Sequence, residues 1–494
     1  MNQASPNLND PHGWQFQHTY GALPDVFFDV ARPQDFPAPQ MVVFNHELAD
    51  ALGLRMRDVD PHKLAEWFSG RELPRGARPI AQAYAGHQFG GFTMLGDGRA
   101  LLLGEQSAPD GSLVDIQFKG SGPTVYSRRG DGLAAVGPML REYLISEAMA
   151  AMGIPTTRSL AVVATGRPVY RERPLPGAVL TRTAASHLRV GTFQFAAGIP
   201  EPTAIAAITH YAIARHDPQL LDLPEDERTL AFFRNVMQRQ AELIADWQSV
   251  GFVHGVMNTD NMTISGESID YGPCAFIDAY HPDTVFSSID TGGRYRFGNQ
   301  PVVAQWNLSR LAEALLPLFH ENRDQAVEIA NDAIGEFPKR FQVASDQRMN
   351  RKLGLSKVRA GDSSLVQSLL DWMQESASDY TTIWHRLTDE AEPARISTDP
   401  AFSDWHAQWL RRLKAEGITL AKAQSIMQAA NPYVIPRNHL VQSALDAAED
   451  EANLSPFLNL LAAVQDPYSH AETQQPYASG PPDGHPPCVT YCGT

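Results

Sequence analysis

Hydrophobic and polar positions follow two different patterns along the chain, and the change falls near residue 200. From residue 81 to residue 200, short apolar runs are separated by tight turns rich in Gly, Asp, Pro and Ser, which is typical of β-strands. After Pro202, apolar residues recur at spacings of three and four, the period of a helix with one buried face. The pattern therefore predicts a small β-rich unit followed by a larger helical unit.

The β-rich unit is expected to hold about six strands and one helix. The helix begins near Pro138 and ends before Gly153, because proline favours helix starts and glycine favours the position just past the end. The expected strands are a three-stranded meander at 89–95, 100–105 and 114–119, a hairpin at 160–165 and 168–171, and a further strand at 178–183.

Helical periodicity fills most of the remaining chain, with a short β interruption at 262–269. Residues 1–80 mix turn signals with short helices at 46–54 and 62–69, and we expect an extension packed on the β-rich unit. Residues 466–494 contain six prolines and no apolar periodicity, which predicts a mobile tail. The expected helices of the second unit are 203–215, 226–250, 302–320, 323–343, 362–378, 403–415, 419–430 and 438–452.

Composition narrows the class of protein. With 494 residues, of which 43% are hydrophobic, the chain can bury a large core, so general disorder is excluded. Its formal charge of −16 disfavours binding to a nucleic-acid polymer or an anionic membrane. The N-terminus does not resemble an export or organelle signal, and no apolar run approaches the roughly 20 residues that span a bilayer. We therefore expect a cytoplasmic protein that does not contact membranes.

The strongest group of polar residues lies in the helical unit, where the run from His254 to Asn261 is followed nine residues later by Asp270 in an Asp-Tyr-Gly motif. Protein kinases use the same order, His-x-Asp, then Asn, then Asp-Phe-Gly, and their Asn and second Asp hold Mg²⁺ against phosphates. Asn261 and Asp270 keep these places and predict a metal site. Val256 occupies the position of the catalytic Asp and cannot accept a proton, so transfer of a γ-phosphate to a hydroxyl loses its base.

Two residues of this run have open roles. Asp260 directly precedes Asn261 and is a candidate base for a differently placed substrate, while the alternative is a turn residue that satisfies backbone N–H groups. His254 is expected to be a core residue that orients the run rather than a general base.

Upstream residues indicate phosphate contacts mainly through their order. Gly96, Gly98 and Arg99 lie between two expected strands, and Lys119 ends the next one, where a lysine can reach phosphate oxygens. Taken alone, these residues indicate only a tight turn and a solvated lysine. Followed by a helix with glutamates and by the Asn and Asp pair, they reproduce the order of a kinase.

That helix carries Glu142 and Glu147. The two positions are about 140° apart on a helical wheel, so at most one of them faces Lys119. Periodicity does not say which.

The stretch from Gly166 to Phe195 has five arginines and one acidic residue, an excess of positive charge that indicates a bound anion. Arg182 and Arg189 are seven residues apart in it, which equals two turns if the segment is helical. Surface arginines paired with distant acids are the alternative. Asp131-Gly132 is a turn by default and a nucleotide contact only in context.

Together these motifs resemble the selenoprotein O family of protein adenylyltransferases, which are pseudokinases. The resemblance extends from about Phe44 to the C-terminus. The motifs that carry it are Gly86-His-Gln-Phe-Gly-Gly, Leu95-Gly-Asp-Gly-Arg99, Lys119-Gly-Ser-Gly-Pro, Tyr126-Ser-Arg-Arg-Gly-Asp-Gly132, Leu140-Arg-Glu-Tyr-Leu-Ile-Ser-Glu147, His254-Gly-Val-Met-Asn-Thr-Asp-Asn261, Asp270-Tyr-Gly272, and Asn431-Pro432 to Arg437-Asn438.

The resemblance implies an α+β, protein-kinase-like two-lobed fold: a small β-rich N-lobe with one key helix, a large helical C-lobe and additional C-terminal helices. The expected parts are an extension at 1–80, the N-lobe at 81–200, the C-lobe with the metal and catalytic loop at 201–345, a helical region at 346–465 and a flexible cysteine-containing tail at 466–494.

The resemblance also implies the transfer of AMP from ATP to Ser, Thr or Tyr hydroxyls of proteins, with Mg²⁺ or Mn²⁺ as cofactor, and with ATP reversed so that its α-phosphorus faces the acceptor. Asp260 matches the proposed proton acceptor, and Asn261 and Asp270 match the metal ligands. Glu142 matches the helix partner of Lys119. The residues that match nucleotide contacts are Gly96, Gly98, Arg99, Lys119, Asp131, Gly132, Arg182, Arg189 and Asp270.

Two other functions remain open at this point. A kinase acting on a small molecule, as in aminoglycoside-type phosphotransferases, shares the His-Gly and Asp-aromatic-Gly elements, but Val256 argues against it. A nucleotide-binding scaffold without activity is disfavoured because both metal ligands are kept. The expected partners are protein substrates and ATP, and we expect a monomer.

The three cysteines, Cys274, Cys488 and Cys492, are too few for a disulfide framework and indicate a reducing compartment. Members of the family commonly end in a redox-active Cys or selenocysteine motif, whereas this chain has Cys-x-x-x-Cys. The hypothesis is a reversible disulfide from Cys274 to one tail cysteine that tunes activity, with inert thiols as the alternative.

Overall fold

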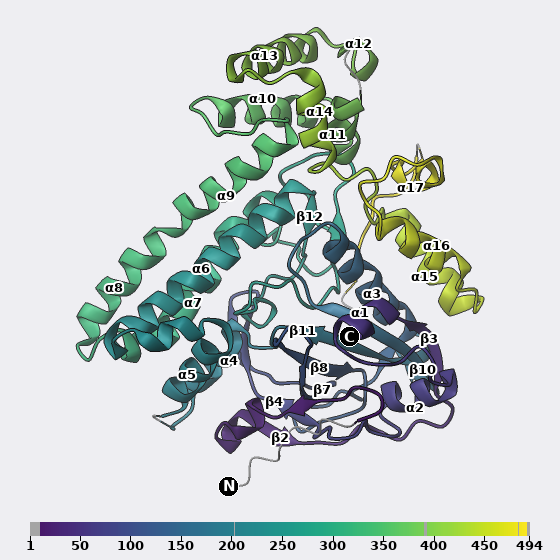
Figure 1. The fold of residues 1–494 in the computed structure, drawn as a ribbon, viewed down its shortest axis with the longest axis vertical. Helices are drawn as coiled ribbons and strands as arrows, with labels where there is room; N and C mark the ends of the chain where they lie inside the picture. The colour runs from purple at the N-terminus through teal and green to yellow at the C-terminus, as the bar shows by residue number, and fades with distance from the viewer. Residues whose placement is uncertain (1–9, 202, 390–392, 483, 492–494) are drawn as a thin grey trace.

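The structure is a computed structural model that describes residues 10–201, 203–389, 393–482 and 484–491. It is a mixed α/β fold with one large sheet and many helices. Figure 1 shows the sheet in the lower part of the view, with long helices beside it and a group of shorter helices at the top. No helix in the described part of the chain combines the length and the apolar character that a bilayer-spanning helix requires.

Within the described residues, nine strands form the large sheet in the order β2-β4-β7-β8-β11-β10-β3, with β1 paired to β7 and β9 paired to β11. The segments expected to be extended from residue 100 to residue 183 lie in this sheet, and residues before 80 add three more strands, so the extension is part of the sheet. The strands are β1 (Phe16–Gln17), β2 (Phe28–Val30), β3 (Gln40–Phe44), β4 (Ile80–Gln82), β7 (Ala100–Ser107), β8 (Leu113–Lys119), β9 (Ala134–Ala135), β10 (Arg158–Tyr170) and β11 (Pro174–Ala184).

The predicted meander is wrong in its first strand. Strand β6 (Gly91–Met94) pairs only with β5 (Ala85–Gln88) in a separate two-stranded sheet, while β7 and β8 pair with each other in the large one. Alternation predicts that a segment is extended, but it does not say which strand it pairs with.

The hairpin predicted within residues 160–171 is also wrong, because β10 runs through the whole segment and pairs with β11. The register shifts between Ala164 and Pro168, and Gly166 in the same stretch has a φ of +71°. A left-handed glycine at a bulge gives the same sequence signal as a turn. The β interruption expected at 262–269 consists of isolated bridges, Arg189 to Thr263 and Thr156 to Ser268.

The helices largely follow the predicted periodicity. The expected helix at 323–343 is divided at Gly335, because Pro338 in the first turn of α9 favours a helix start. Helices α4, α11, α12, α16 and α17 lie outside the predicted ranges. Of these, α4 is short and buried on most sides, so it carries no amphipathic pattern. The helices are α1 (His46–Ala51), α2 (Pro61–Ser69), α3 (Val136–Ala151), α4 (Val190–Gly198), α5 (Ala204–His216), α6 (Glu225–Ser249), α7 (Gln300–Phe319), α8 (Arg323–Gly335), α9 (Phe337–Lys352), α10 (Asp362–Glu375), α11 (Tyr380–Asp389), α12 (Pro393–Ile396), α13 (Pro400–Glu416), α14 (Leu420–Gln428), α15 (Asn438–Asp450), α16 (Ser455–Val464) and α17 (Gln475–Ala478).

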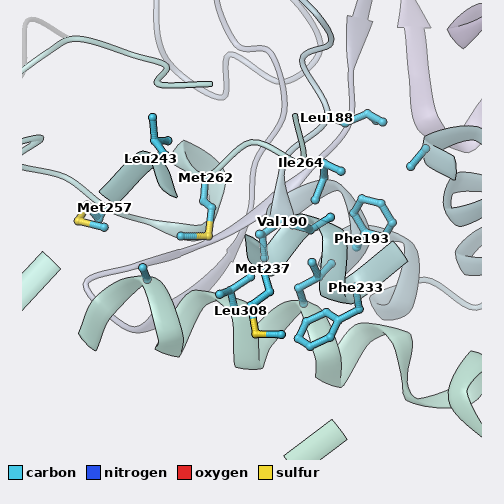
Figure 2. Close-up of a cluster of buried hydrophobic side chains, with 14 of the residues drawn as sticks. Leu188, Val190, Phe193, Phe233, Met237, Leu243, Met257, Met262, Ile264 and Leu308 are labelled. Carbon is cyan, nitrogen blue, oxygen red and sulfur yellow. The ribbon is translucent and has the colours of Figure 1, made fainter. Parts of the chain in front are cut away.

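A buried hydrophobic cluster formed by α4, α6 and α7 supports the segment from His254 to Asn261, called here the 254–261 loop. Met257 of this loop and Met262, the residue directly after it, extend into the cluster, where Met237, Leu243 and Leu308 lie (Figure 2). These methionines are adjacent in sequence to the polar residues of the loop, so burial of their side chains fixes where the polar residues emerge.

The C-terminal helices pack on the first unit rather than apart from it. Helices α15 and α16 contact α3 (Figure 1), and their buried side chains, such as Leu445 and Phe457, share a cluster with Leu140 and Tyr143 of α3. Arg437, which precedes α15, is buried and bonds to Asp278 and Asp379.

The segment predicted to be a mobile tail makes specific contacts through its described residues, and its mobility stays a prediction. These residues include α17, and the Thr490 backbone N–H bonds to the Phe286 carbonyl at 2.8 Å while its Oγ1 bonds to the Pro273 carbonyl at 2.7 Å. A proline-rich segment without periodicity can still be held by specific contacts, and these contacts leave no pattern in the sequence.

Leu308 provides a test of the cluster beneath the loop. The side chain is fully buried, so Leu308→Ala removes apolar contacts and leaves a cavity. We expect the free energy of unfolding to fall by about 3 kcal/mol, measured by urea denaturation. Leu410→Ala is the matched control, because Leu410 is 38% exposed and its truncation should change stability by less than about 0.5 kcal/mol. Equal effects of the two substitutions would contradict the assignment.

Candidate active site

A cavity of about 570 Å³ lies where the glycine turn after β6, the ends of β8 and β11, α3 and the 254–261 loop meet. Its volume is within the range of small-molecule sites. Every residue that the sequence selects as a nucleotide, metal or base candidate lines it. These residues are Gly96, Gly98, Arg99, Lys119, Asp131, Gly132, Glu142, Arg182, Arg189, Asp260, Asn261 and Asp270.

Five charged side chains at the base of this cavity form what we call the charge cluster: Lys119, Glu142, Arg182, Arg189 and Asp270. Asp270 Oδ1 lies 2.6 Å from both Lys119 Nζ and Arg182 Nη1, and its Oδ2 lies 3.2 Å from Arg189 Nη1. Glu142 lies 2.5 Å from Lys119 and 3.1 Å from Arg182. Burial alone would raise the pKa of Asp270, but the charges of Arg182, Lys119 and Arg189 outweigh it and hold that pKa well below its ordinary value.

The local folds explain how these side chains meet. Lys119 ends β8 and Arg182 lies on the adjacent strand β11, opposite Gln117, whose Oε1 accepts from Arg182 Nε at 2.8 Å. Arg189 immediately precedes α4. The helical spacing considered for the two arginines is therefore wrong, since they come from a strand and from a helix N-terminus. They converge because both segments border the same cavity.

The structure also decides between the two glutamates of α3. Glu142 faces Lys119, whereas Glu147 faces away and binds Arg158 at 2.7 Å and Asn45 at 2.8 Å. Glu147 is thus a structural residue that ties α3 to β10.

Asn261, the last residue of the 254–261 loop, and Asp270 both line the cavity. Asn261 Nδ2 donates to the Val256 carbonyl at 2.9 Å, which leaves the amide oxygen as the acceptor of that side chain. Asp270 has a φ of +62°, an uncommon left-handed conformation for a residue other than glycine. An amide oxygen and a carboxylate bordering a polar cavity form a donor set suited to a hard divalent cation. Among the described residues, no group of three or more His, Cys, Asp or Glu side chains is arranged to hold a metal.

His254 is confirmed as a buried orienting residue. Its Nε2 bonds to the Ile269 carbonyl at 2.8 Å, and its ring stacks on Trp247 with centroids 5.3 Å apart. Burial lowers the pKa of His254, which favours the neutral ring.

Asp260 has an unusual environment. It is 8% exposed, and in the described parts of the chain its buried Oδ1 has no hydrogen-bond partner. Burial raises its pKa to about 6, although Arg189 partly opposes this effect. No described residue donates to Oδ1, but a contact with the backbone N–H of Asp260 itself is among the causes that act on this carboxyl, so the alternative of a turn residue stays open. A Cβ on Gly86 would lie 2.3 Å from Oδ1, so only glycine at that position leaves room for the carboxylate.

The glycine turn has a structural explanation as well. A Cβ on Gly96 would lie 2.3 Å from Tyr126, and one on Gly132 would lie 2.2 Å from the Gly122 backbone. These glycines let the 120–132 segment approach the turn closely and form one wall of the cavity. Asp131 in that wall pairs with Arg171 at 2.8 Å.

Three lining residues escaped the sequence interpretation. Asp97 is buried within the glycine turn, accepts from the Gln82 backbone and Gln117, and has its pKa raised to about 6 by burial. Tyr84 lies beneath Arg189, with its ring centroid 4.5 Å from the guanidinium carbon. Thr490 belongs to the tail. Asp97 stands between two glycines already selected, which is the one signal that pointed to it.

Neither Cys274 nor Cys488 lines the cavity, and the hypothesis of a regulatory disulfide stays a prediction. Cys274 is buried and unbonded, and burial raises its pKa to about 11, which disfavours the reactive thiolate. Cys488 is a free, partly buried thiol, two residues before Thr490. Cys492 lies outside the described residues.

Glu142→Gln tests the charge cluster. It removes one of the two carboxylates that neutralise Lys119 and Arg182, which then remain buried with less compensation. We expect the free energy of unfolding to fall by about 3 kcal/mol, measured by urea denaturation. Glu66→Gln is the control, because the Glu66 pair with Lys63 lies at the surface and should contribute less than about 1 kcal/mol. A Glu142 variant as stable as the Glu66 variant would show that the cluster does not depend on this carboxylate.

Comparison of the whole sequence with known proteins identifies the family of this chain. The sequence matches the family described as Protein adenylyltransferase SelO over residues 12–465. Relatives named Protein nucleotidyltransferase YdiU include those of Brevibacillus brevis, 52% identical over 483 residues with 98% of each chain covered, and of Halalkalibacterium halodurans, 50% identical over 494 residues with 100% of this chain and 99% of the relative covered. The relative of Syntrophotalea carbinolica is 50% identical over 497 residues, with 100% of each chain covered. This chain therefore belongs to the SelO family of nucleotidyltransferases.

Proposed function

We propose that the protein transfers AMP from ATP to Ser, Thr or Tyr hydroxyls of other proteins and releases pyrophosphate. The observation that carries this proposal is the combination found in one cavity. Asn261, Asp270 and Lys119 keep a kinase-like arrangement for a metal and phosphates, Val256 replaces the kinase base, and two buried arginines add positive charge.

A kinase-like two-lobed arrangement is part of the proposal. The large sheet with α3 corresponds to the small lobe, and α4 to α9 with the 254–261 loop correspond to the large one. The cavity is lined from both, and the pair of Lys119 with Glu142 is the contact that joins the kinase strand lysine to its helix.

ATP is proposed to bind with its terminal phosphates toward Arg182 and Arg189. Guanidinium groups bind phosphate oxygens in a bidentate manner, and these two are already held in place by bonds to Asp270 and Gln117. With the terminal phosphates there, the α-phosphorus is the one left for the acceptor hydroxyl. Lys119 stabilises negative charge that develops during transfer.

Asn261 and Asp270 are the residues proposed to hold Mg²⁺ or Mn²⁺. When bound, the cation would neutralise phosphate charge and align the phosphates for in-line displacement. With a cation bound, Asp270 would share its carboxylate between the cation and its partners Lys119 and Arg182, and these two side chains would supply positive charge to phosphate oxygens.

Asp260 is proposed to accept or orient the proton of the acceptor hydroxyl. Asp260 lines the cavity and its Oδ1 accepts no hydrogen bond from any described residue, so the carboxylate keeps acceptor capacity for that hydroxyl. Its neighbours Gly86 and Leu95 exclude water from one side of the carboxylate.

The experiment that tests the proposal uses ATP labelled at either the α- or the γ-phosphate, with Mg²⁺ or Mn²⁺ and candidate acceptor proteins. Label that reaches protein only from the α-position supports AMP transfer. Label from the γ-position on protein or metabolite would identify a kinase instead, and the absence of label from both would indicate a scaffold.

Replacing the metal-binding carboxylate gives a first prediction. Asp270→Ala should lower AMP transfer by at least about a thousandfold, because charge neutralisation and phosphate alignment are lost together. Label transfer from α-labelled ATP measures it. Asp346→Ala, which removes an exposed carboxylate on α9 that bonds to Ser363 and Gln342, is the control with unchanged transfer. Full activity of the Asp270 variant would refute the metal assignment.

A second prediction separates Asp260 from nucleotide binding. Asp260→Asn should lower kcat by about a hundredfold, while the Kd for ATP measured by calorimetry changes less than about threefold. The reason is that Asp260 is assigned to the acceptor hydroxyl and not to the phosphates. Unchanged turnover, or a loss explained entirely by weaker ATP binding, would remove its assigned role.

A further inference from the structure

The hairpin of β5 and β6 borders the nucleotide site proposed above, and its second strand, β6, has no role in that site. It stands outside the large sheet. Its first strand is attached to the 254–261 loop, because the His87 N–H donates to Thr259 Oγ1 at 2.7 Å and the Phe89 N–H donates to Asn258 Oδ1 at 3.3 Å. The outer edge of β5 is therefore closed by the loop that carries Asp260.

The outer edge of β6 is open. The Leu95 N–H bonds to the Tyr84 carbonyl at 2.9 Å, and hydrogen-bonded pairs alternate along an antiparallel ladder. Consequently, the N–H and C=O groups of Phe92 and Met94 point away from β5. Over the ranges that the structure describes, neither group bonds to a segment outside the hairpin, and β6 has no second neighbouring strand.

The same strand exposes large apolar side chains. Phe92 is 51% exposed and Met94 is 44% exposed, and residues two apart lie on one face of a strand. Phe89 at the turn is 41% exposed. An open edge with exposed apolar side chains is normally avoided, since it pairs with other chains. Its presence here indicates a use.

The strand leads to the cavity. Leu95, the residue after β6, lines the cavity, as does Gln88 of β5. Gly86, which pairs with Thr93 of β6, lies against the Asp260 carboxylate. An extended chain paired along β6 would thus be directed toward Asp260.

Charge near the cavity favours an acidic chain. Arg128 and Arg129 are exposed in the segment that forms the opposite wall, and Arg128 lines the cavity. Neither forms an ion pair with any residue in the described ranges, in a protein whose net charge is −16. Unpaired arginines attract carboxylates, and rim charges mainly govern partner choice.

We propose that β6 is the docking strand for an extended, acidic segment of the acceptor protein, which pairs with the free edge, packs apolar side chains on Phe92 and Met94, and sets its carboxylates against Arg129. This inference rests on the proposed function, because it assumes that the acceptor is a protein. In this proposal, main-chain hydrogen bonds bind the acceptor segment and its side chains determine which segments are accepted, as in other proteins that add a strand to an exposed sheet edge.

The test uses two synthetic peptides, each with one central Tyr, one with alternating Glu and Val around it and one with each Glu replaced by Lys. Transfer from α-labelled ATP gives kcat/KM for each peptide.

Met94→Pro removes the outward N–H without breaking the bonds between β5 and β6. Arg129→Glu reverses the charge at the rim. The control is Val30→Pro, because Val30 is 76% exposed on the edge strand β2, and the adjacent Ala31 N–H bonds inward to Pro79.

We expect wild type to prefer the acidic peptide by about tenfold or more. Met94→Pro should lower kcat/KM for it by about tenfold, mainly through KM, and Arg129→Glu should shift the preference toward the Lys peptide by a similar factor. The Kd for ATP should be unchanged in both variants, and Val30→Pro should behave as wild type.

The docking proposal is overturned if both variants keep the wild-type kcat/KM, or if wild type labels folded proteins but neither peptide. A wild-type protein that transfers no α-label to any protein or peptide refutes the proposed function itself. Because that result concerns the wild-type protein and not the variants, failure of the proposed function is distinguishable from failure of the docking proposal.

Discussion

The buried carboxylate of Asp270 is the interaction on which the rest of the site depends. It accepts from Lys119 on β8, Arg182 on β11 and Arg189 before α4, and these elements come from different parts of the chain. A buried charge that loses its partner is strongly destabilising, so each of these elements is held in register with the segment that carries Asp270. Glu142 adds α3 to the same set. Asp97 lies 4.0 Å from Arg189, so three cationic side chains meet three carboxylates at this place.

The 254–261 loop is fixed from two sides with different chemistry. Below it, Met257 and Met262 are buried among α4, α6 and α7, and His254 bonds to the carbonyl that precedes Asp270. Above it, the β5–β6 hairpin bonds to the side chains of Thr259 and Asn258. Asp260 lies between these supports, and within the described residues its Oδ1 has no hydrogen-bond donor, so the loop is held on both sides of this carboxylate.

Much of this site was predictable from sequence because its residues lie in short motifs whose order alone indicates a kinase-like arrangement. Sequence could not choose between Glu142 and Glu147, since both lie on one helix and the choice depends on where Lys119 lies in space. The helical spacing considered for Arg182 and Arg189 is wrong for the same reason. Seven residues separate two positions on one helix face, but they also separate a strand residue from the residue before the next helix. The separate sheet of β5 and the contacts of the tail depend on pairings between distant segments, which local periodicity does not record.

The motif around Arg437 shows why the C-terminal helices are more than a buttress. Arg437 is fully buried and bonds to Asp278 and Asp379, each at 2.7 Å, while the Asn438 side chain donates to a carbonyl of β13 (Ala275–Phe276). Asp278 lies eight residues after Asp270 on the same continuous segment. Buried ion pairs therefore hold this segment at both ends. Asp270 is bound by cations from the sheet and from the start of α4, and Asp278 is bound by Arg437 at the start of α15. A left-handed Asp270 is a conformation that the surrounding structure must impose, and two fixed ends supply that constraint. The C-terminal region thus contributes to the geometry of the Asp270 carboxylate, and α15 also lines the cavity through Gln442, Leu445 and Glu449.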